Sequence, residues 1–222
     1  HVQDISKGFS DACKEFKMQL LGGDTNQGKE ISIHVVLFGS LKKYVKRKNA
    51  RIGDLICTTG AFGYTSAALD ILLKNKKSSK TFSKKSKDLF FRPKPRLSFG
   101  IKSAKYITSC MDSSDGLSSC LNEMSRQSKK KFEITNYPTN EDVKEFSKRN
   151  RMDLKKLVFD GGEEFELVFT TSPKNLAKIR KVARETNIKI FEIGCVRKGN
   201  GAFFDDEKES FRIKDKGWEH FR

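Results

Sequence analysis

Residues 112–117 read Asp-Ser-Ser-Asp-Gly-Leu, and this stretch decides how the rest of the chain is interpreted. It follows a run that we expect to be buried, and apolar residues then recur at helical spacing over residues 117–124. Asp112 and Asp115 therefore lie at the start of a helix, where carboxylates can ligate Mg²⁺ and free N–H groups favour anions. The alternative is that Asp112 or Ser113 only caps the helix.

Two further loops place an acid directly after paired glycines. Residues 22–25 read Gly-Gly-Asp-Thr, and residues 161–167 read Gly-Gly-Glu-Glu-Phe-Glu-Leu and lead into a strand. Paired glycines let the backbone approach a ligand closely, so that the acid after them is well placed to meet a metal or a polar substrate. Each loop alone is typical of a tight turn. Three acidic loops of this kind in one chain favour a common phosphate and metal site.

In this order, the three motifs resemble those of the thiamine-monophosphate kinase family, which is related to aminoimidazole ribonucleotide synthetase. The resemblance runs from about residue 5 to residue 221. The further stretches that carry it are residues 47–54 (RKNARIGD), 59–63 (TGAFG), 92–96 (RPKPR), 193–194 (IG) and 217–221 (GWEHF).

The resemblance implies an enzyme that transfers the γ-phosphoryl group of ATP to thiamine monophosphate, with Mg²⁺ as cofactor, and gives thiamine diphosphate. Asp112 and Asp115 match its catalytic residues. Its expected partners are thiamine monophosphate, ATP and a second copy of the chain, without nucleic acid or membrane. The remaining matches are the metal ligands Asp24, Asp112 and Asp115, the nucleotide contacts Gly23, Asp24, Arg47 and Ser114, and the substrate contacts Glu163 and Trp218.

The resemblance also implies a domain organisation. Family members carry an upstream half that begins with a short acidic motif, and this sequence starts after it. Residues 1–45 are therefore expected to be the remnant of an N-terminal α/β domain that binds ATP and metal and whose sheet forms the dimer. Residues 46–222 are expected to form a C-terminal α+β domain. Whether the chain as given is active alone is left open, and the strand at residues 31–38 is expected to pair with a second copy.

Hydrophobic periodicity and turn residues predict an α+β fold, a layered mixed sheet with helices on one face. The predicted helices are residues 4–18, 64–73, 97–108, 116–127, 140–150 and 173–186. The predicted strands are residues 31–38, 54–58, 132–135, 167–169, 189–193, 202–204 and 211–213.

The charge of the chain suggests an anionic partner. Lys and Arg number 45 against 28 Asp and Glu, which gives a net charge of +17. Seven of the lysines fall within residues 74–87, with Phe82 as the one aromatic residue among them. Nucleic-acid modules usually interleave aromatic side chains with such charge. We therefore interpret residues 74–88 as a solvated, flexible loop, and the alternative functions are a nucleic-acid-binding protein or a non-catalytic relative of the same superfamily.

Several other classes of function find no support. The sequence has no apolar run of about 18 residues and its start is not a signal peptide, which argues against a membrane span. Its five cysteines are odd in number and include no C-x-x-C, as expected for a reducing, cytoplasmic compartment. Residues 23–29 match the start of a P-loop, but Glu30 follows where a Ser or Thr is required.

Overall fold

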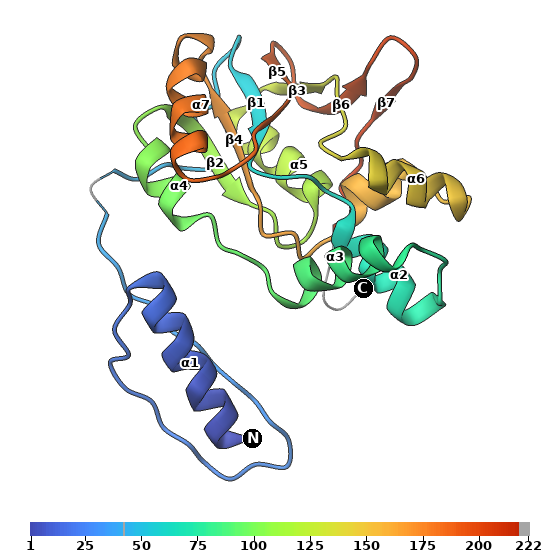
Figure 1. Cartoon of the computed structure of the whole chain (residues 1–222). Coiled ribbons are helices and arrows are strands. Elements are labelled where there is room, and N and C mark those ends of the chain that lie inside the picture. Colours follow the sequence, from blue (N-terminus) through green and yellow to red (C-terminus); the bar gives the residue numbers. More distant parts are fainter. Residues whose placement is uncertain (42, 218–222) are drawn as a thin grey trace. The chain divides into compact units, whose positions relative to one another are not determined.

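The computed structural model describes residues 1–41 and 43–217, and its internal contacts divide the chain into two units, His1–Ser40 and Leu41–Arg222 (Figure 1). The boundary falls five residues before the expected one at residue 45. The first unit contains helix α1 (Val2–Phe16), which ends at Lys17 in the left-handed conformation.

The strand expected at residues 31–38 is not formed within the single chain. The segment is extended, but no strand is formed there within the described residues. Its apolar side chains are largely exposed, at 69% for Ile31, 59% for Val35 and 85% for Phe38. A strand is defined by its ladder of hydrogen bonds to a neighbour, and alternating apolar residues alone cannot supply one.

The second unit is built around a seven-stranded sheet with the order β2-β4-β1-β5-β3-β6-β7. The expected mixed sheet is confirmed, because β3 and β6 are parallel and every other pair is antiparallel. The strands are β1 (Leu55–Thr58), β2 (Ile107–Asp112), β3 (Lys131–Ile134), β4 (Leu167–Thr171), β5 (Phe191–Arg197), β6 (Gly201–Asp205) and β7 (Ser210–Arg212).

The helices of this unit agree with the sequence pattern at α2, α5, α6 and α7. No helix of the described residues combines the length and apolar character that a membrane crossing requires. The helices are α2 (Tyr64–Lys74), α3 (Lys80–Phe91), α4 (Leu97–Ser103), α5 (Leu117–Ser128), α6 (Glu141–Arg149) and α7 (Leu176–Glu185), with a π-helical turn at Lys156–Asp160 and a 3₁₀ turn at Pro173–Asn175.

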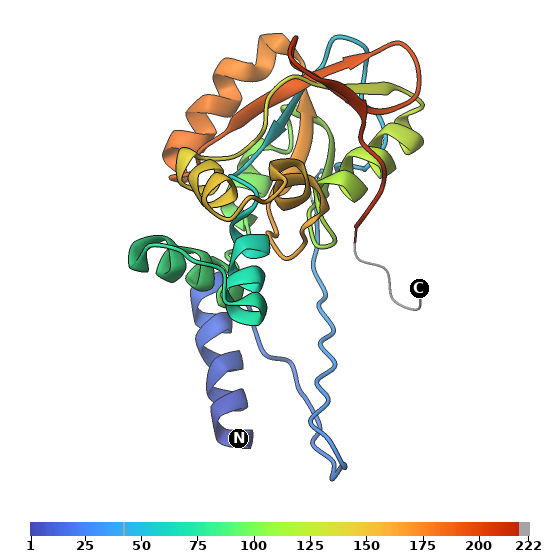
Figure 2. The same cartoon turned by 90° about the vertical axis from the view of Figure 1, so that its right-hand side faces the viewer.

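Helices cover both faces of the sheet, whereas helices on one face were expected. Successive residues of a strand point to opposite faces. In β1, Ile56 packs in the core cluster that contains the buried residues of α5, whereas Cys57 packs with Phe169, Ile179 and Val182 in a cluster that contains residues of α4 and α7. Figure 2 shows α7 in orange on one side of the sheet and α5 in yellow-green on the other.

The structure differs from the prediction in the lysine-rich segment, because Lys80–Phe91 forms helix α3 where a loop was expected. The Ser79 side chain caps it by accepting a hydrogen bond from the Phe82 N–H at 3.1 Å. Phe82 stacks on Phe146 with ring centroids 5.0 Å apart. One buried aromatic residue on an otherwise charged helix is sufficient to dock it, and the lysines occupy its solvent face.

The structure also differs from the prediction at strand β2. The helix expected over residues 97–108 ends at Ser103, and Ile107–Asp112 is an edge strand that pairs with β4. Ile107 and Ser109 are buried while Thr108 and Cys110 are half-buried, which is the two-residue period of a strand. The Asp-Ser-Ser-Asp loop therefore joins a strand to helix α5.

Candidate active site

Three neighbouring strands bring the candidate site together at one end of the sheet. Strand β2 ends at Asp112, opposite Leu167 at the start of β4, and β1 ends at Thr58, opposite Val168. Because these pairs are antiparallel, the loops after β1 and β2 lie beside the loop before β4. Motifs from three distant parts of the sequence share this edge.

Backbone hydrogen bonds join the Asp-Ser-Ser-Asp loop to the glycine-glutamate loop that precedes β4. The N–H of Glu163 donates to the Ser114 carbonyl at 2.8 Å, and the N–H of Phe165 donates to the Ser113 carbonyl at 2.8 Å. The N–H of Ser113 donates in return to the Glu166 carbonyl at 2.9 Å. Each loop therefore satisfies the backbone polar groups of the other, so that the two form one structural element.

Glycines are needed where these loops touch. Gly116 has φ of +115°, and a Cβ there would lie 2.9 Å from the Gly161 carbonyl oxygen. A Cβ on Gly162 would lie 2.6 Å from the Ser114 carbonyl oxygen. Real Cβ atoms do not approach a backbone oxygen so closely, so any larger residue would separate the two loops.

Three carboxylates of this element remain exposed, on Asp112, Asp115 and Glu163. The Asp112 carboxylate makes no hydrogen bond to any described residue, and that of Asp115 accepts one from the Ser114 hydroxyl at 3.1 Å. Glu163 has φ of 70°, a left-handed conformation that is uncommon for a residue other than glycine and is frequent at functional sites. Their oxygen atoms are available to a ligand.

The donor set fits Mg²⁺. Mg²⁺ prefers oxygen ligands and is usually held by one or two carboxylates together with water and phosphate oxygens. Asp112 and Asp115 could supply these two carboxylates. The described residues contain no cluster of three or more His, Cys, Asp or Glu side chains arranged to hold a metal. The site thus fits a cation shared with a phosphate ligand, and not a cage made of protein side chains alone.

Arg47 lies within electrostatic range of the same helix start. Burial raises the pKa of the Cys120 thiol in α5 to about 12, and the charges of Asp112, Asp115 and Arg47 also act on this thiol. Arg47 is exposed. A guanidinium group near this helix is available to a phosphate group whose cation the two aspartates would hold.

A buried ion pair that the sequence did not reveal supports the glycine-glutamate loop. Arg96 donates from Nε to Glu166 Oε2 at 2.7 Å and from Nη2 to Glu166 Oε1. The Thr59 hydroxyl donates to Glu166 Oε2 at 2.7 Å and accepts from the Leu167 N–H at 2.8 Å. The Arg96 and Glu166 side chains are only 19% and 7% exposed. The ion pair anchors the loop to the residue that precedes α4, and Thr59 anchors it to the segment after β1. The one signal in the sequence was an arginine within the proline-rich stretch 92–96.

Glu164 is turned into the protein, unlike its neighbour Glu163. Its Oε1 accepts a hydrogen bond from the Gly63 N–H at 3.1 Å, whereas its buried Oε2 has no partner among the described residues. Burial raises the pKa of this carboxyl to about 8. Burial therefore favours the protonated form of the Glu164 carboxyl.

The structure brings four of the expected site residues together, namely Asp112, Ser114, Asp115 and Glu163. The other expected metal ligand, Asp24, belongs to the first unit, as does Gly23. Asp24 is exposed there and accepts hydrogen bonds from the Thr25 N–H at 2.8 Å and the Asn26 amide at 3.1 Å. The expected substrate residue Trp218 lies outside the described residues.

Comparisons with known proteins agree with these motifs. Residues 51–206 match the family described as AIR synthase related protein, C-terminal domain. Over its whole length the chain is 50% identical to a thiamine-monophosphate kinase of Nitrosopumilus maritimus, of which it covers 70%. It is 35% identical to the enzyme of that name from Pyrococcus horikoshii, of which it covers 67%.

A solved structure shows the same fold. The structure of AaThiL complexed with AMPPCP and TMP matches 99% of this chain with a TM-score of 0.79 and 26% sequence identity, and the chain covers 68% of it. The chain thus spans about two thirds of the length of these relatives. With the loops of the candidate site in the expected order along the chain, these matches show that it belongs to the thiamine-monophosphate kinase family.

Proposed function

We propose that this protein transfers a phosphoryl group from ATP to thiamine monophosphate in a reaction that requires Mg²⁺. The observation that carries the proposal is the pair of exposed aspartates, Asp112 and Asp115, on a loop that is fixed to the glycine-glutamate loop. The names of the relatives, and the AMPPCP and TMP in the AaThiL complex, support the two substrates.

The chemistry suits the residues of the site. A phosphate oxygen of thiamine monophosphate attacks the γ-phosphorus of ATP, and the bond from this phosphorus to the β–γ bridging oxygen breaks, which releases ADP and thiamine diphosphate. The attacking oxygen is already ionised, so no general base is needed. Positioning and charge neutralisation then supply most of the catalysis. Bound Mg²⁺ would neutralise charge on the phosphate oxygens, and Asp112 and Asp115 would hold it.

We propose the remaining roles from the family motifs. Ser114 and Arg47 contact the nucleotide, as do Gly23 and Asp24 of the first unit, and Asp24 also contributes to metal binding. Glu163 and Trp218 contact the thiamine moiety. The exposed carboxylate of Glu163 and the unusual backbone conformation of this residue support its role.

Heat stabilisation measured by differential scanning fluorimetry tests the proposal. AMPPCP should raise the melting temperature only when Mg²⁺ is present, and thiamine monophosphate should raise it further. Trp218→Ala should weaken binding of thiamine monophosphate by about 1 to 2 kcal/mol and leave AMPPCP binding unchanged, because an aromatic ring stabilises the cationic thiazolium. Salt-sensitive retention on nucleic acid with no effect of nucleotide would contradict the proposal.

We also propose that the first unit pairs with a second copy of the chain to form a homodimer. In residues 31–38 the alternate side chains Ile31, Ile33, Val35 and Leu37 are all at least half exposed, at 69%, 52%, 59% and 73%. An extended segment with unpaired backbone groups and an apolar face is a template for pairing with another strand.

Sedimentation equilibrium tests the homodimer. The chain should be dimeric, and Ile33→Lys with Val35→Lys should shift it toward the monomer. Lys7→Glu with Lys14→Glu on α1 is a control that also adds charge changes to the first unit, and it should leave the dimer intact. A monomeric unaltered chain would refute the pairing.

We further infer a cytoplasmic location, since all five cysteines are free thiols and the proposed reaction uses ATP.

A further inference from the structure

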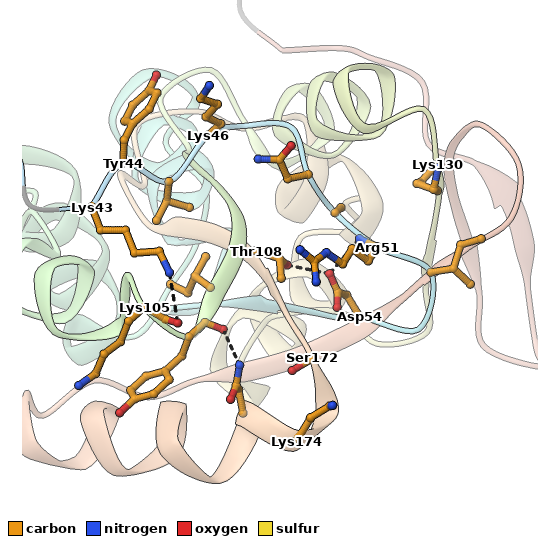
Figure 3. Close-up of a pocket in the computed structure, with 17 residues that line it drawn as sticks. Lys43, Tyr44, Lys46, Arg51, Asp54, Lys105, Thr108, Lys130, Ser172 and Lys174 are labelled. Atoms are coloured by element: carbon orange, nitrogen blue, oxygen red, sulfur yellow. Dashed lines mark hydrogen bonds between the residues drawn. The ribbon is translucent and has the colours of Figure 1, made fainter.

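A hollow lies at the opposite end of the strands that carry the candidate active site. It has a volume of about 1000 Å³. Figure 3 shows that its walls come from separate parts of the chain, with Lys46 on the segment before β1, Lys105 next to β2, and Lys174 after β4. Because these segments are distant in sequence, the hollow is a product of the fold and not of one flexible loop.

Positive charge dominates the lining of this hollow. Asp54 is the one carboxylate among the described lining residues, and it is buried. Its Oδ2 already accepts hydrogen bonds from the Thr108 hydroxyl at 2.7 Å and from the Arg51 N–H at 2.9 Å. The basic residues of the lining are Lys43, Lys46, Arg51, Lys105, Lys130 and Lys174.

These six cations have no carboxylate partner within the described part of the chain. The twelve ion pairs there use other side chains, including lysines on α1, α2, α3 and α6. Lys43 Nζ instead approaches the Lys105 carbonyl at 3.4 Å, and Lys130 Nζ approaches the Lys129 carbonyl at 3.2 Å. Like charges around one hollow without counter-charges repel one another, and an anion bound among them reduces that repulsion.

We propose that this hollow, which we call the basic pocket, binds a small molecule that carries several phosphate groups. Its volume lies at the upper end of the range of about 300 to 1000 Å³ for small-molecule sites. Cations from several walls of one hollow suit a compact anion, whereas a nucleic-acid strand requires an elongated groove. Tyr44 and Tyr106 provide apolar surface in the same lining.

The basic pocket is separate from the candidate active site. Ile107, at the start of β2, lines the basic pocket, and Asp112 ends the same strand at the active site. Five strand residues span about 16 Å. A phosphate group in the basic pocket is therefore not the group that the active site transfers, and the inference does not depend on the proposed kinase activity.

Isothermal titration calorimetry with inorganic tripolyphosphate tests this inference. The buffer contains EDTA, so that a site that requires a metal ion does not bind the ligand. We expect saturable binding with one tripolyphosphate per chain. The triple variant Lys46→Gln, Lys105→Gln and Lys174→Gln should weaken binding by about tenfold or more, since several exposed charge contacts of modest strength add together. Its melting temperature should match that of the unaltered chain, because none of the three lysines is part of an ion pair.

The matched control is the triple variant Lys148→Gln, Lys181→Gln and Lys198→Gln, which removes the same charge from exposed lysines outside the basic pocket. It should change tripolyphosphate affinity by less than about twofold, as expected from screening of distant charges. Equal weakening by the two variants would show non-specific attraction and overturn the inference, as would the absence of binding to the unaltered chain. Tighter binding of a single-stranded RNA that the pocket variant abolishes would overturn the assignment to a small molecule.

Discussion

The two ends of strand β2 carry opposite charge and are built in different ways. At the Asp112 end, the carboxylates lie in two different environments. Glu166 is buried and paired with Arg96, whereas Asp112 and Asp115 are exposed on a loop that is held by backbone hydrogen bonds. At the Ile107 end, cations line the basic pocket without carboxylate partners in the described structure. The acidic end is therefore shaped by contacts within the fold, whereas the charge of the basic end is not balanced by carboxylates of the described residues. Mutations of the buried ion pair should therefore affect stability at the first end, whereas mutations of the exposed lysines should affect ligand binding at the second.

The largest effect on stability is expected at the buried ion pair. Arg96→Gln should lower the free energy of unfolding by about 3 to 5 kcal/mol, because it leaves the Glu166 carboxylate buried without its partner. Urea denaturation measures this loss. Glu192→Gln, which removes the surface pair between Arg180 and Glu192, should cost no more than about 1 kcal/mol. Similar losses for the two variants would show that the buried Arg96–Glu166 pair stabilises the protein no more than a surface ion pair does.

The exposed aspartates should behave in the opposite way. Asp112→Asn or Asp115→Asn should slow phosphoryl transfer by about 10² to 10³, because each removes charge stabilisation from the transferring group. The Mg²⁺-dependent stabilisation by AMPPCP should also disappear, while the melting temperature without ligand stays the same. Asp205→Asn, at an exposed position in β6, is the control and should leave the rate and the melting temperature unchanged. A normal rate at saturating Mg²⁺ would remove that aspartate from the site.

Glu164 gives the acidic end a pH dependence. Its pKa is about 8 in the folded protein and 4.5 ordinarily. Between these values the folded chain keeps a proton that the unfolded chain has released, so the free energy of unfolding falls as pH rises from about 4.5 to about 8. Glu164→Gln imitates the protonated side chain and should remove this decline, as measured by urea denaturation at a series of pH values. Glu163→Gln should retain the decline, and a flat profile for the unaltered chain would contradict the burial of Glu164.

The smallest effect is expected at the basic end. Lys105→Gln with Lys174→Gln should change the free energy of unfolding by no more than about 0.5 kcal/mol, as is usual for exposed residues without specific partners. Phosphoryl transfer under the same conditions should stay within about twofold of the unaltered rate, since surface charges at that distance are screened. A large loss of activity without loss of stability would show that the two ends are coupled through the strands they share.

The candidate site was predictable from sequence to the extent that it consists of short motifs. The Asp-Ser-Ser-Asp loop and the Gly-Gly-Glu loop were expected to form a site because three acidic loops of this kind occur in one chain and in the order of the family motifs. Arg96 was not assigned a role, because its importance depends on Glu166, which lies 70 positions away along the chain. Glu163 and Glu164 look alike in the sequence, and only packing decides that Glu163 is exposed whereas Glu164 is half-buried with one carboxylate oxygen out of contact with solvent.

The fold was predictable where local periodicity and packing agree. Helices α2, α5 and α6 have clear apolar faces and matched their expected positions closely. Strand β2 was missed because Ile107 and Thr108 were read as the end of the preceding helix, and the edge of a sheet has no local signal. Helix α3 was missed because its lysines resemble a solvated loop, while Phe82 is the residue that docks it. Residues 31–38 have the pattern of a strand, yet a strand also needs a neighbour.

The strand order has a consequence for how the protein is made. Strand β1 pairs only with β4 and β5, both of which are encoded more than a hundred positions later. At about 5 to 20 residues per second, the ribosome takes roughly 5 to 20 s to supply them. During this interval Ile56 and Cys57, which are fully buried in the finished protein, have no sheet to enter. Nascent chains should therefore depend on chaperones until β4 and β5 have been made.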